Sequence, residues 1–282
     1  MVFKRKTEEI SLPEFLRQHI RNENDAKLAF LSYLINHDVI FVGETHTTEL
    51  HREKLAEWMN DIKAAGVKYI GVEWLANTPE VNKALENRDV EFIKAYLAEH
   101  WGKYDPNFVS SALDLINSAW TNNITIVPLD VENAENQTKR EYRWNENLKP
   151  FFEECGKDPQ SKILIICGSG HADLESQANI LREYNGKLKA GCVDFCGGSK
   201  SRRSIIEQEA YNITSKDSTL KDAWIVFSGE QFSNSCNMLL QAAWAQPNTL
   251  TIIMPFIETD EGGLYEMYRR LNDIRPEKIE RK

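Results

Sequence analysis

The sequence lacks several features that would place it in a broad class at once. No stretch approaches the roughly 18 apolar residues that a membrane span needs. No block of lysine or arginine stands out, and the formal net charge is -9. Nucleic acids and anionic membranes are therefore not expected as partners. Residues 1–10 are charged and contain no apolar core of the kind that a secretory signal carries.

Cysteines and nucleotide-binding motifs are also scarce. The five cysteines are an odd number and are scattered, which favours free thiols in a reducing compartment over a disulfide framework. We therefore expect a cytoplasmic protein, or an effector secreted without a cleavable signal. Glycine-rich loops for phosphates or dinucleotides are missing, as is the Gly-x-Ser-x-Gly spacing of a serine hydrolase elbow.

What is present is a globular composition in which strand-like and helix-like segments alternate. Hydrophobic residues make up 41% and charged residues 27% of 282 residues, enough to build a core without disulfides. The short apolar runs that are typical of strands are 39–42, 67–74, 124–129, 163–167, 189–195, 223–227 and 250–254. The alternation predicts an α/β fold with a mostly parallel sheet, helices on both faces, and an active site at the C-terminal edge of the strands.

The expected organisation is one α/β domain over residues 1–282. The motif-bearing core covers about 38–195, and the part from about 200 to 282 extends the same sheet. A helix is expected at about 234–244 between the last two strands, and a long amphipathic helix at about 138–154. No linker rich in proline, glycine or serine divides the chain.

Two short runs carry the chemical signal. Gly43-Glu44-Thr45-His46 and Gly168-Ser169-Gly170-His171 each follow a strand-like stretch and precede a helix-like one. Open α/β sheets keep their ligands and catalytic groups at such strand-to-helix turns. A single Gly-x-x-His is common by chance, but two in the same structural context indicate a site.

Two carboxylates at other strand ends complete the expected site. Glu73 lies near the end of the second strand and Asp130 ends the third. In a parallel sheet these ends share one edge with Glu44, His46 and His171. A carboxylate beside an imidazole orients it and raises its basicity, which suits the activation of water. The alternatives are a helix cap or a surface group for Glu73 and a turn for Asp130.

Further groups near the first motif are secondary candidates. His51 and Arg52 follow it within about one helical turn and either point into the crevice or lie on an exposed face. A divalent metal (zinc, manganese or cobalt) is compatible with the residue types, and its ligands would then be His46, Glu73 and His171.

Three segments of the sequence together resemble motifs of the erythromycin esterase/ChaN-like group. They are Val39 to His46, Ile70-Gly71-Val72-Glu73 and Ile165 to Ala172. This group is related in fold to TIKI/TraB proteins and to domains of bacterial toxins and effectors. The segment Arg140 to Leu148 is similar to the helix that precedes the second motif in the group. The resemblance covers roughly residues 38–195.

The resemblance implies an α/β hydrolase with Glu44, His46, Glu73 and His171 at the site. The sequence thus favours hydrolysis of an ester, lactone or amide bond in a small-molecule or peptide substrate. His46, oriented by Glu44 or Glu73, would activate water, and His171 would act as acid or second ligand. Arg52 or a helix N-terminus would hold the oxyanion, and a metal is not required. The alternatives are a ChaN-like protein that binds haem through histidine or tyrosine, and an effector that acts on a host protein.

Overall fold

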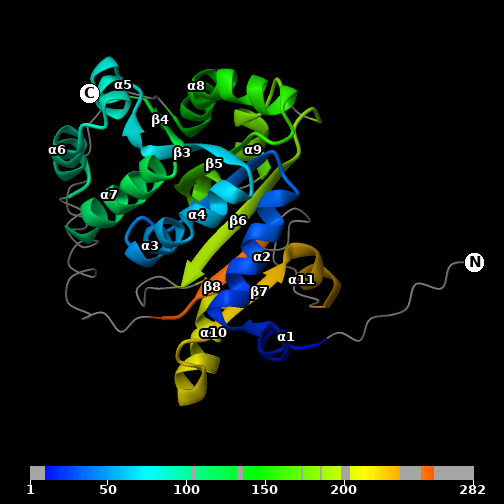
Figure 1. Cartoon of the computed structure of the whole chain (residues 1–282). Coiled ribbons are helices and arrows are strands. Elements are labelled where there is room, and N and C mark those ends of the chain that lie inside the picture. Colours follow the sequence, from blue (N-terminus) through cyan, green and yellow to red (C-terminus); the bar gives the residue numbers. More distant parts are fainter. Residues whose placement is uncertain are drawn as a thin grey trace, which may run out of the picture.

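One eight-stranded sheet runs through the computed structural model, which describes residues 10–102, 106–131, 136–172, 174–184, 186–197, 204–235 and 249–256 (Figure 1). The strands are β1 (Ile20–Arg21), β2 (Val39–Glu44), β3 (Val67–Ala76), β4 (Thr125–Asp130), β5 (Lys162–Gly168), β6 (Ala190–Gly197), β7 (Trp224–Ser228) and β8 (Thr249–Met254). They lie in the order β1-β7-β8-β6-β2-β5-β3-β4. All neighbours from β8 to β4 are parallel, whereas β7 is antiparallel to β8 and to β1. The predicted α/β fold with a mostly parallel sheet is confirmed.

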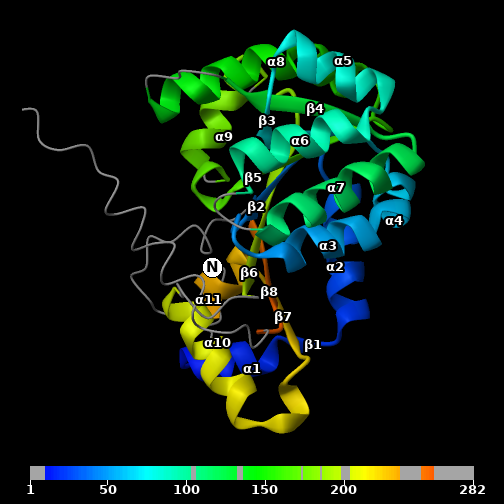
Figure 2. The same cartoon turned by 90° about the vertical axis from the view of Figure 1, so that its left-hand side faces the viewer.

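Helices fill the connections between the strands. They are α1 (Leu12–Gln18), α2 (Glu23–Ile35), α3 (Glu49–Glu57), α4 (Met59–Ala64), α5 (Pro79–Asn87), α6 (Val90–His100), α7 (Pro106–Thr121), α8 (Gln137–Lys157), α9 (Leu174–Ile180), α10 (Ile205–Lys216) and α11 (Gly229–Ser235), with 3-10 turns η1 (Ser169–His171) and η2 (Ser218–Leu220). In Figure 2, α3, α4 and α7 lie on one side of the strands and α9 lies on the other.

The two faces of the sheet are separated by the period-two alternation of each strand. In β2, Ile40 and Val42 enter one buried cluster, which also contains residues of α2 to α7. Val39 and Phe41 enter a second cluster with residues of α8 and α9. Because both faces are covered, every residue of β2 is buried, as is usual for a central parallel strand.

A third buried cluster covers the end of the sheet that carries the antiparallel strands. It joins α1, α10 and α11 to β7 and β8, and β8 pairs directly with β6. The strands β7 and β8 therefore belong to the same sheet as the strands that carry the motifs, whereas β1 and α10 were not predicted. The helix expected at about 234–244 falls almost entirely outside the described residues, and α11 ends at Ser235. Within the described part of the chain, no helix has both the length and the apolar character to cross a membrane.

Candidate functional site

The first histidine motif forms a buried ion-paired cluster at the end of β2. Glu44 is 1% exposed, and its Oε1 pairs with Nδ1 of His46 at 3.1 Å. Its Oε2 accepts a hydrogen bond from Arg52 Nη1 at 2.9 Å. Arg52 is fully buried and also donates to Ser111 Oγ and to the backbone carbonyl of His46. Arg52 therefore lies behind Glu44, where it positions the carboxylate that holds the His46 ring.

Neighbouring charges set the protonation of this pair. Burial raises the pKa of Glu44, but the charge of Arg52 and the hydrogen bond from His46 outweigh it and lower that pKa to about 2. Burial lowers the pKa of His46, but the hydrogen bond and charge of Glu44, with the charge of Glu73, outweigh it and raise that pKa. An ionised Glu44 can only accept, so Nδ1 of His46 carries the hydrogen and Nε2 is left to exchange protons.

Glu73 reaches the site because β3 is irregular at this position. The pairing of β3 with β4 is regular up to Val72 and Pro128, shifts register, and resumes at Ala76 and Asp130. Such irregularities re-aim a side chain at the edge of a sheet. Glu73 is the first residue after the regular stretch, and its side chain is buried.

The carboxylate of Glu73 lies between the two histidines. Its Oε2 accepts the backbone N–H of Gly168 at 2.6 Å and lies 3.8 Å from Nε2 of His46. Its Oε1 lies 3.7 Å from Nε2 of His171. The two motifs, far apart in the chain, therefore direct the same ring nitrogen at one carboxylate. This brings together the four residues that the sequence nominated as catalytic.

Asp130 joins the cluster through Arg140 on α8. Arg140 Nε donates to Asp130 Oδ1 at 2.7 Å, and Arg140 Nη1 lies 3.0 Å from Glu73 Oε1. The same Nη1 is 3.5 Å from Nε2 of His171. The Arg140 side chain is 23% exposed, so this guanidinium borders the site and is reachable from solvent, unlike that of Arg52.

His51 lies buried against the backbone of the first motif, and neither an exposed position nor contact with Glu73 is found for it. It is fully buried, and its Nδ1 accepts the backbone N–H of Thr45 at 3.3 Å. Burial lowers the pKa of His51 to about 4, opposed by the charge of Glu44 and assisted by the charge of Arg52. His51 is therefore neutral at ordinary pH and supports the turn that carries His46.

Two residues of the site were missed as functional groups by sequence reasoning, although one signal was present. Arg140 and Glu141 lie within the first two turns of α8, and Glu141 pairs with Nδ1 of His171 at 2.9 Å. Glu141 falls on the buried stripe of this helix with Trp144, Asn145 and Leu148. A glutamate within an apolar i, i+3, i+4, i+7 stripe is an unusual placement that a helical projection of the sequence reveals.

The arrangement does not fit the metal that the residue types suggested. Among the residues that the structure describes, no group of three or more histidine, cysteine, aspartate or glutamate side chains is arranged to hold a metal ion. The physical reason is the Arg140 guanidinium, which lies against both Glu73 Oε1 and His171 Nε2. Its positive charge occupies the position from which a dication would have to bind these atoms.

The two histidines of the cluster direct Nε2 at a carboxylate. The Nε2 atoms of His46 and His171 both lie within 4 Å of the Glu73 carboxylate, so neither imidazole holds Nε2 apart from other groups as an axial ligand to a haem iron would. The aromatic wall beside His46 consists of Trp101, whose ring centroid is 5.1 Å from that of the imidazole, and Phe108, which stacks on Trp101.

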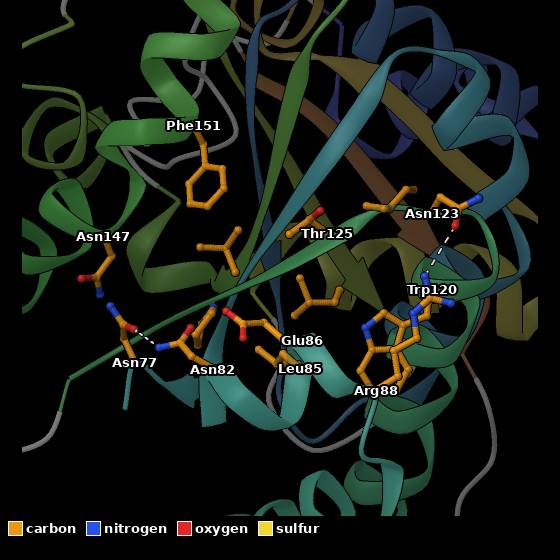
Figure 3. Close-up of a pocket in the computed structure, with 14 residues that line it drawn as sticks. Asn77, Asn82, Leu85, Glu86, Arg88, Trp120, Asn123, Thr125, Asn147 and Phe151 are labelled. Atoms are coloured by element: carbon orange, nitrogen blue, oxygen red, sulfur yellow. Dashed lines mark hydrogen bonds between the residues drawn. The ribbon is translucent and has the colours of Figure 1, made fainter. Parts of the chain in front are cut away.

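A separate cavity of about 510 Å³ lies along β4, the edge strand of the sheet (Figure 3). Its walls combine residues of β4 with Leu85 and Glu86 of α5 and Asn147 and Phe151 of α8. None of the four candidate catalytic residues lines it. The cavity and the histidine cluster are therefore distinct features of the fold.

The close approach at Gly168 gives a direct test of the site geometry. A Cβ at Gly168 would lie 3.0 Å from His46 Nε2 and 3.5 Å from Glu73 Oε2, whereas one at Gly170 would meet nothing within 4 Å. We expect Gly168→Ala to lower the free energy of unfolding by about 1–3 kcal/mol through overpacking, and Gly170→Ala to change it by less than about 1 kcal/mol. Urea unfolding of both variants checks this, and equal effects would contradict the geometry.

Comparison with known proteins yields structural likenesses only. No family model and no curated protein matches the chain. The type III effector HopBA1 is similar over 67% of this chain and 92% of its own, at 15% identity and a TM-score of 0.49. RRSP, a MARTX toxin effector domain from Vibrio vulnificus, is similar over 64% and 38%, at 18% identity and a TM-score of 0.41. ChaN of Campylobacter jejuni, which binds haem cofacially, is similar over 66% and 88%, at 14% identity and a TM-score of 0.38.

Proposed function

We propose that the chain is a hydrolase of ester, lactone or amide bonds and that His46 is its general base. The observation that supports this most is the convergence of Nε2 of His46 and Nε2 of His171 on the Glu73 carboxylate, at 3.8 and 3.7 Å. These gaps exceed a direct hydrogen bond, and a bridging water fits such a spacing. A water held by Glu73 and His46 is then in position to attack a bound carbonyl.

In the proposed mechanism each polar group has one task. His46 takes a proton from the water as its oxygen bonds to the carbonyl carbon, and Glu44 stabilises the resulting imidazolium. The carbonyl oxygen becomes an oxyanion, for which Arg140 is the nearest partly exposed cation of the cluster. When the tetrahedral intermediate collapses, the leaving oxygen or nitrogen receives the proton from His46, directly or by way of His171. Arg52 takes no part in binding the oxyanion, because it is buried behind Glu44.

Activity on a panel of chromogenic esters, lactones and amides tests the proposal. General acid–base groups contribute about 10²- to 10⁴-fold in rate, so His46→Ala and His171→Ala should each lower kcat/KM by about a hundredfold or more on any substrate that is turned over. His37→Ala is the matched control, because His37 precedes β2 at the opposite end from Glu44. Unchanged turnover in both site variants, with folding verified by circular dichroism, refutes the proposal.

A further inference from the structure

We infer that Glu141 is the positioning residue of His171: it holds the imidazole as the Nδ1–H tautomer and directs Nε2 at Glu73, as Glu44 does for His46. The catalytic meaning of this pairing rests on the proposed function, but the pairing itself is a statement about geometry and can be measured without a substrate.

The surroundings of Glu141 require that it accepts hydrogen bonds only. The residue is 1% exposed. Its Oε1 is contacted by His171 Nδ1 at 2.9 Å, by Ser176 Oγ at 2.7 Å and by Gln137 Nε2 at 3.0 Å. Its Oε2 accepts from Asn179 Nδ2 at 2.8 Å. With amide and hydroxyl donors on both oxygens, the buried group is stabilised as a carboxylate.

The orientation of the Gln137 amide is fixed independently. Gln137 Nε2 also donates to the backbone carbonyl of Gly170 at 3.2 Å, and a carbonyl can only accept. The nitrogen of this amide is therefore the atom that faces Glu141. Because the carboxylate has no hydrogen to give, Nδ1 of His171 must be the donor in their hydrogen bond.

The other ring nitrogen is then a bare acceptor. Neutral imidazole carries a single N–H, so Nε2 of His171 has a lone pair, and it faces Arg140 Nη1 at 3.5 Å. Trp144 packs against the imidazole, with ring centroids 4.9 Å apart. The hydrogen bond to Glu141 and this ring contact together fix the direction of Nε2.

The two imidazoles thus form a matched arrangement around Glu73. In each, a nearly fully buried glutamate holds Nδ1 and leaves Nε2 toward the shared carboxylate. Each ring also has an aromatic neighbour, Trp101 at His46 and Trp144 at His171, and the guanidinium of Arg140 lies beside Nε2 of His171. The pairing by Glu141 is what gives the second histidine the same ring orientation as the first.

Glu141 could instead have a structural role alone. The carboxylate would then only connect α8 to α9 through Ser176 and Asn179, and the tautomer of the His171 imidazole would not depend on Glu141. Asn179→Ala weakens this tie and leaves the contact with His171 in place. The tautomer of the His171 ring therefore distinguishes the two roles, whereas a loss of stability does not.

Long-range ¹⁵N–¹H correlation spectra at alkaline pH, recorded on protein labelled at its six histidines, measure the tautomer of each imidazole. The signal of His171 is assigned by its loss in His171→Ala. We expect the Nδ1–H form for His171 in the wild type and in Asn179→Ala. Glu141→Leu should lose that preference, while Glu146→Leu, at an exposed site on the same helix, should keep it. If Glu141→Leu does not fold, Glu141→Asp, which withdraws the carboxylate by one methylene, should weaken the preference.

An Nε2–H form in the wild type, or an unchanged tautomer in folded Glu141→Leu or Glu141→Asp, overturns the inference. A chain that hydrolyses none of the substrates but carries His171 as Nδ1–H refutes the proposed function and leaves this pairing standing. If activity depends on His171 but its imidazole carries the hydrogen on Nε2, the pairing with Glu141 is refuted and the proposed function stands.

Discussion

Replacing Arg52 with methionine is expected to lower the free energy of unfolding by about 3–5 kcal/mol, because it leaves the Glu44 carboxylate buried without its opposite charge. The guanidinium donates to Glu44, to Ser111 and to the His46 carbonyl, and it lies 4.2 Å from the centroid of the Phe108 ring. Domains have only about 5–15 kcal/mol of stability in total. Urea unfolding followed by circular dichroism measures the loss.

The same helix offers a matched control for this prediction. Lys54 on α3 pairs with Glu23 at 2.6 Å and with Glu57 at 2.8 Å, but both carboxylates are largely exposed. Exposed ion pairs contribute less than about 1 kcal/mol, so Lys54→Met should change little. A loss in Arg52→Met no larger than that in Lys54→Met would contradict the role that we assign to the buried pair.

Acidification is expected to destabilise the folded chain through His51. The pKa of this buried imidazole is about 4 when folded, against about 6.5 when unfolded. The unfolded chain therefore binds a proton first as the pH falls, and stability that is fully present above pH 6.5 is lost toward pH 4. The linkage corresponds to about 3 kcal/mol in full and to about 2 kcal/mol between pH 7 and pH 5.

His51→Asn isolates this contribution. The asparagine Oδ1 can accept the Thr45 N–H in place of Nδ1, but it does not titrate. The raised pKa of His46 acts in the opposite direction, so the quantity to compare is the change in unfolding free energy between pH 7 and pH 5 in each protein. We expect that change to be smaller by about 2 kcal/mol in the variant. The same pH dependence in both proteins would rule out His51 as its source.

The local patterns of the sequence predicted the framework of the site well. The strand that ends at Glu44 and the strand that precedes His171 were identified, because apolar runs bounded by glycine are strong strand signals. The common edge of β2, β4 and β5 then follows from parallel pairing, which alternating strands and helices require. The C-terminal strands β7 and β8 were also identified, with bounds shifted by one residue at each end or less.

Local sequence patterns could not predict the contacts that depend on distant parts of the chain. The register shift after Val72 aims Glu73 at both histidines, and it depends on how β4 pairs with β3. The burial of Arg52 depends on Ser111, which is 59 residues away. Glu141 meets His171 across 30 residues of sequence, and only its unusual place on the apolar stripe of α8 indicated that a buried partner was needed.

The order of the strands has a consequence for any attempt to divide the chain. The region that carries both histidine motifs ends on β6, yet the outer side of β6 is bonded to β8, the last strand in the part of the chain that the structure describes. Cutting the chain near residue 195 would leave a row of bare amide and carbonyl groups along an apolar strand. Such a row is a template for pairing with other chains. The pairing of β8 with β6 therefore covers an edge of the motif-bearing region that such a cut would expose.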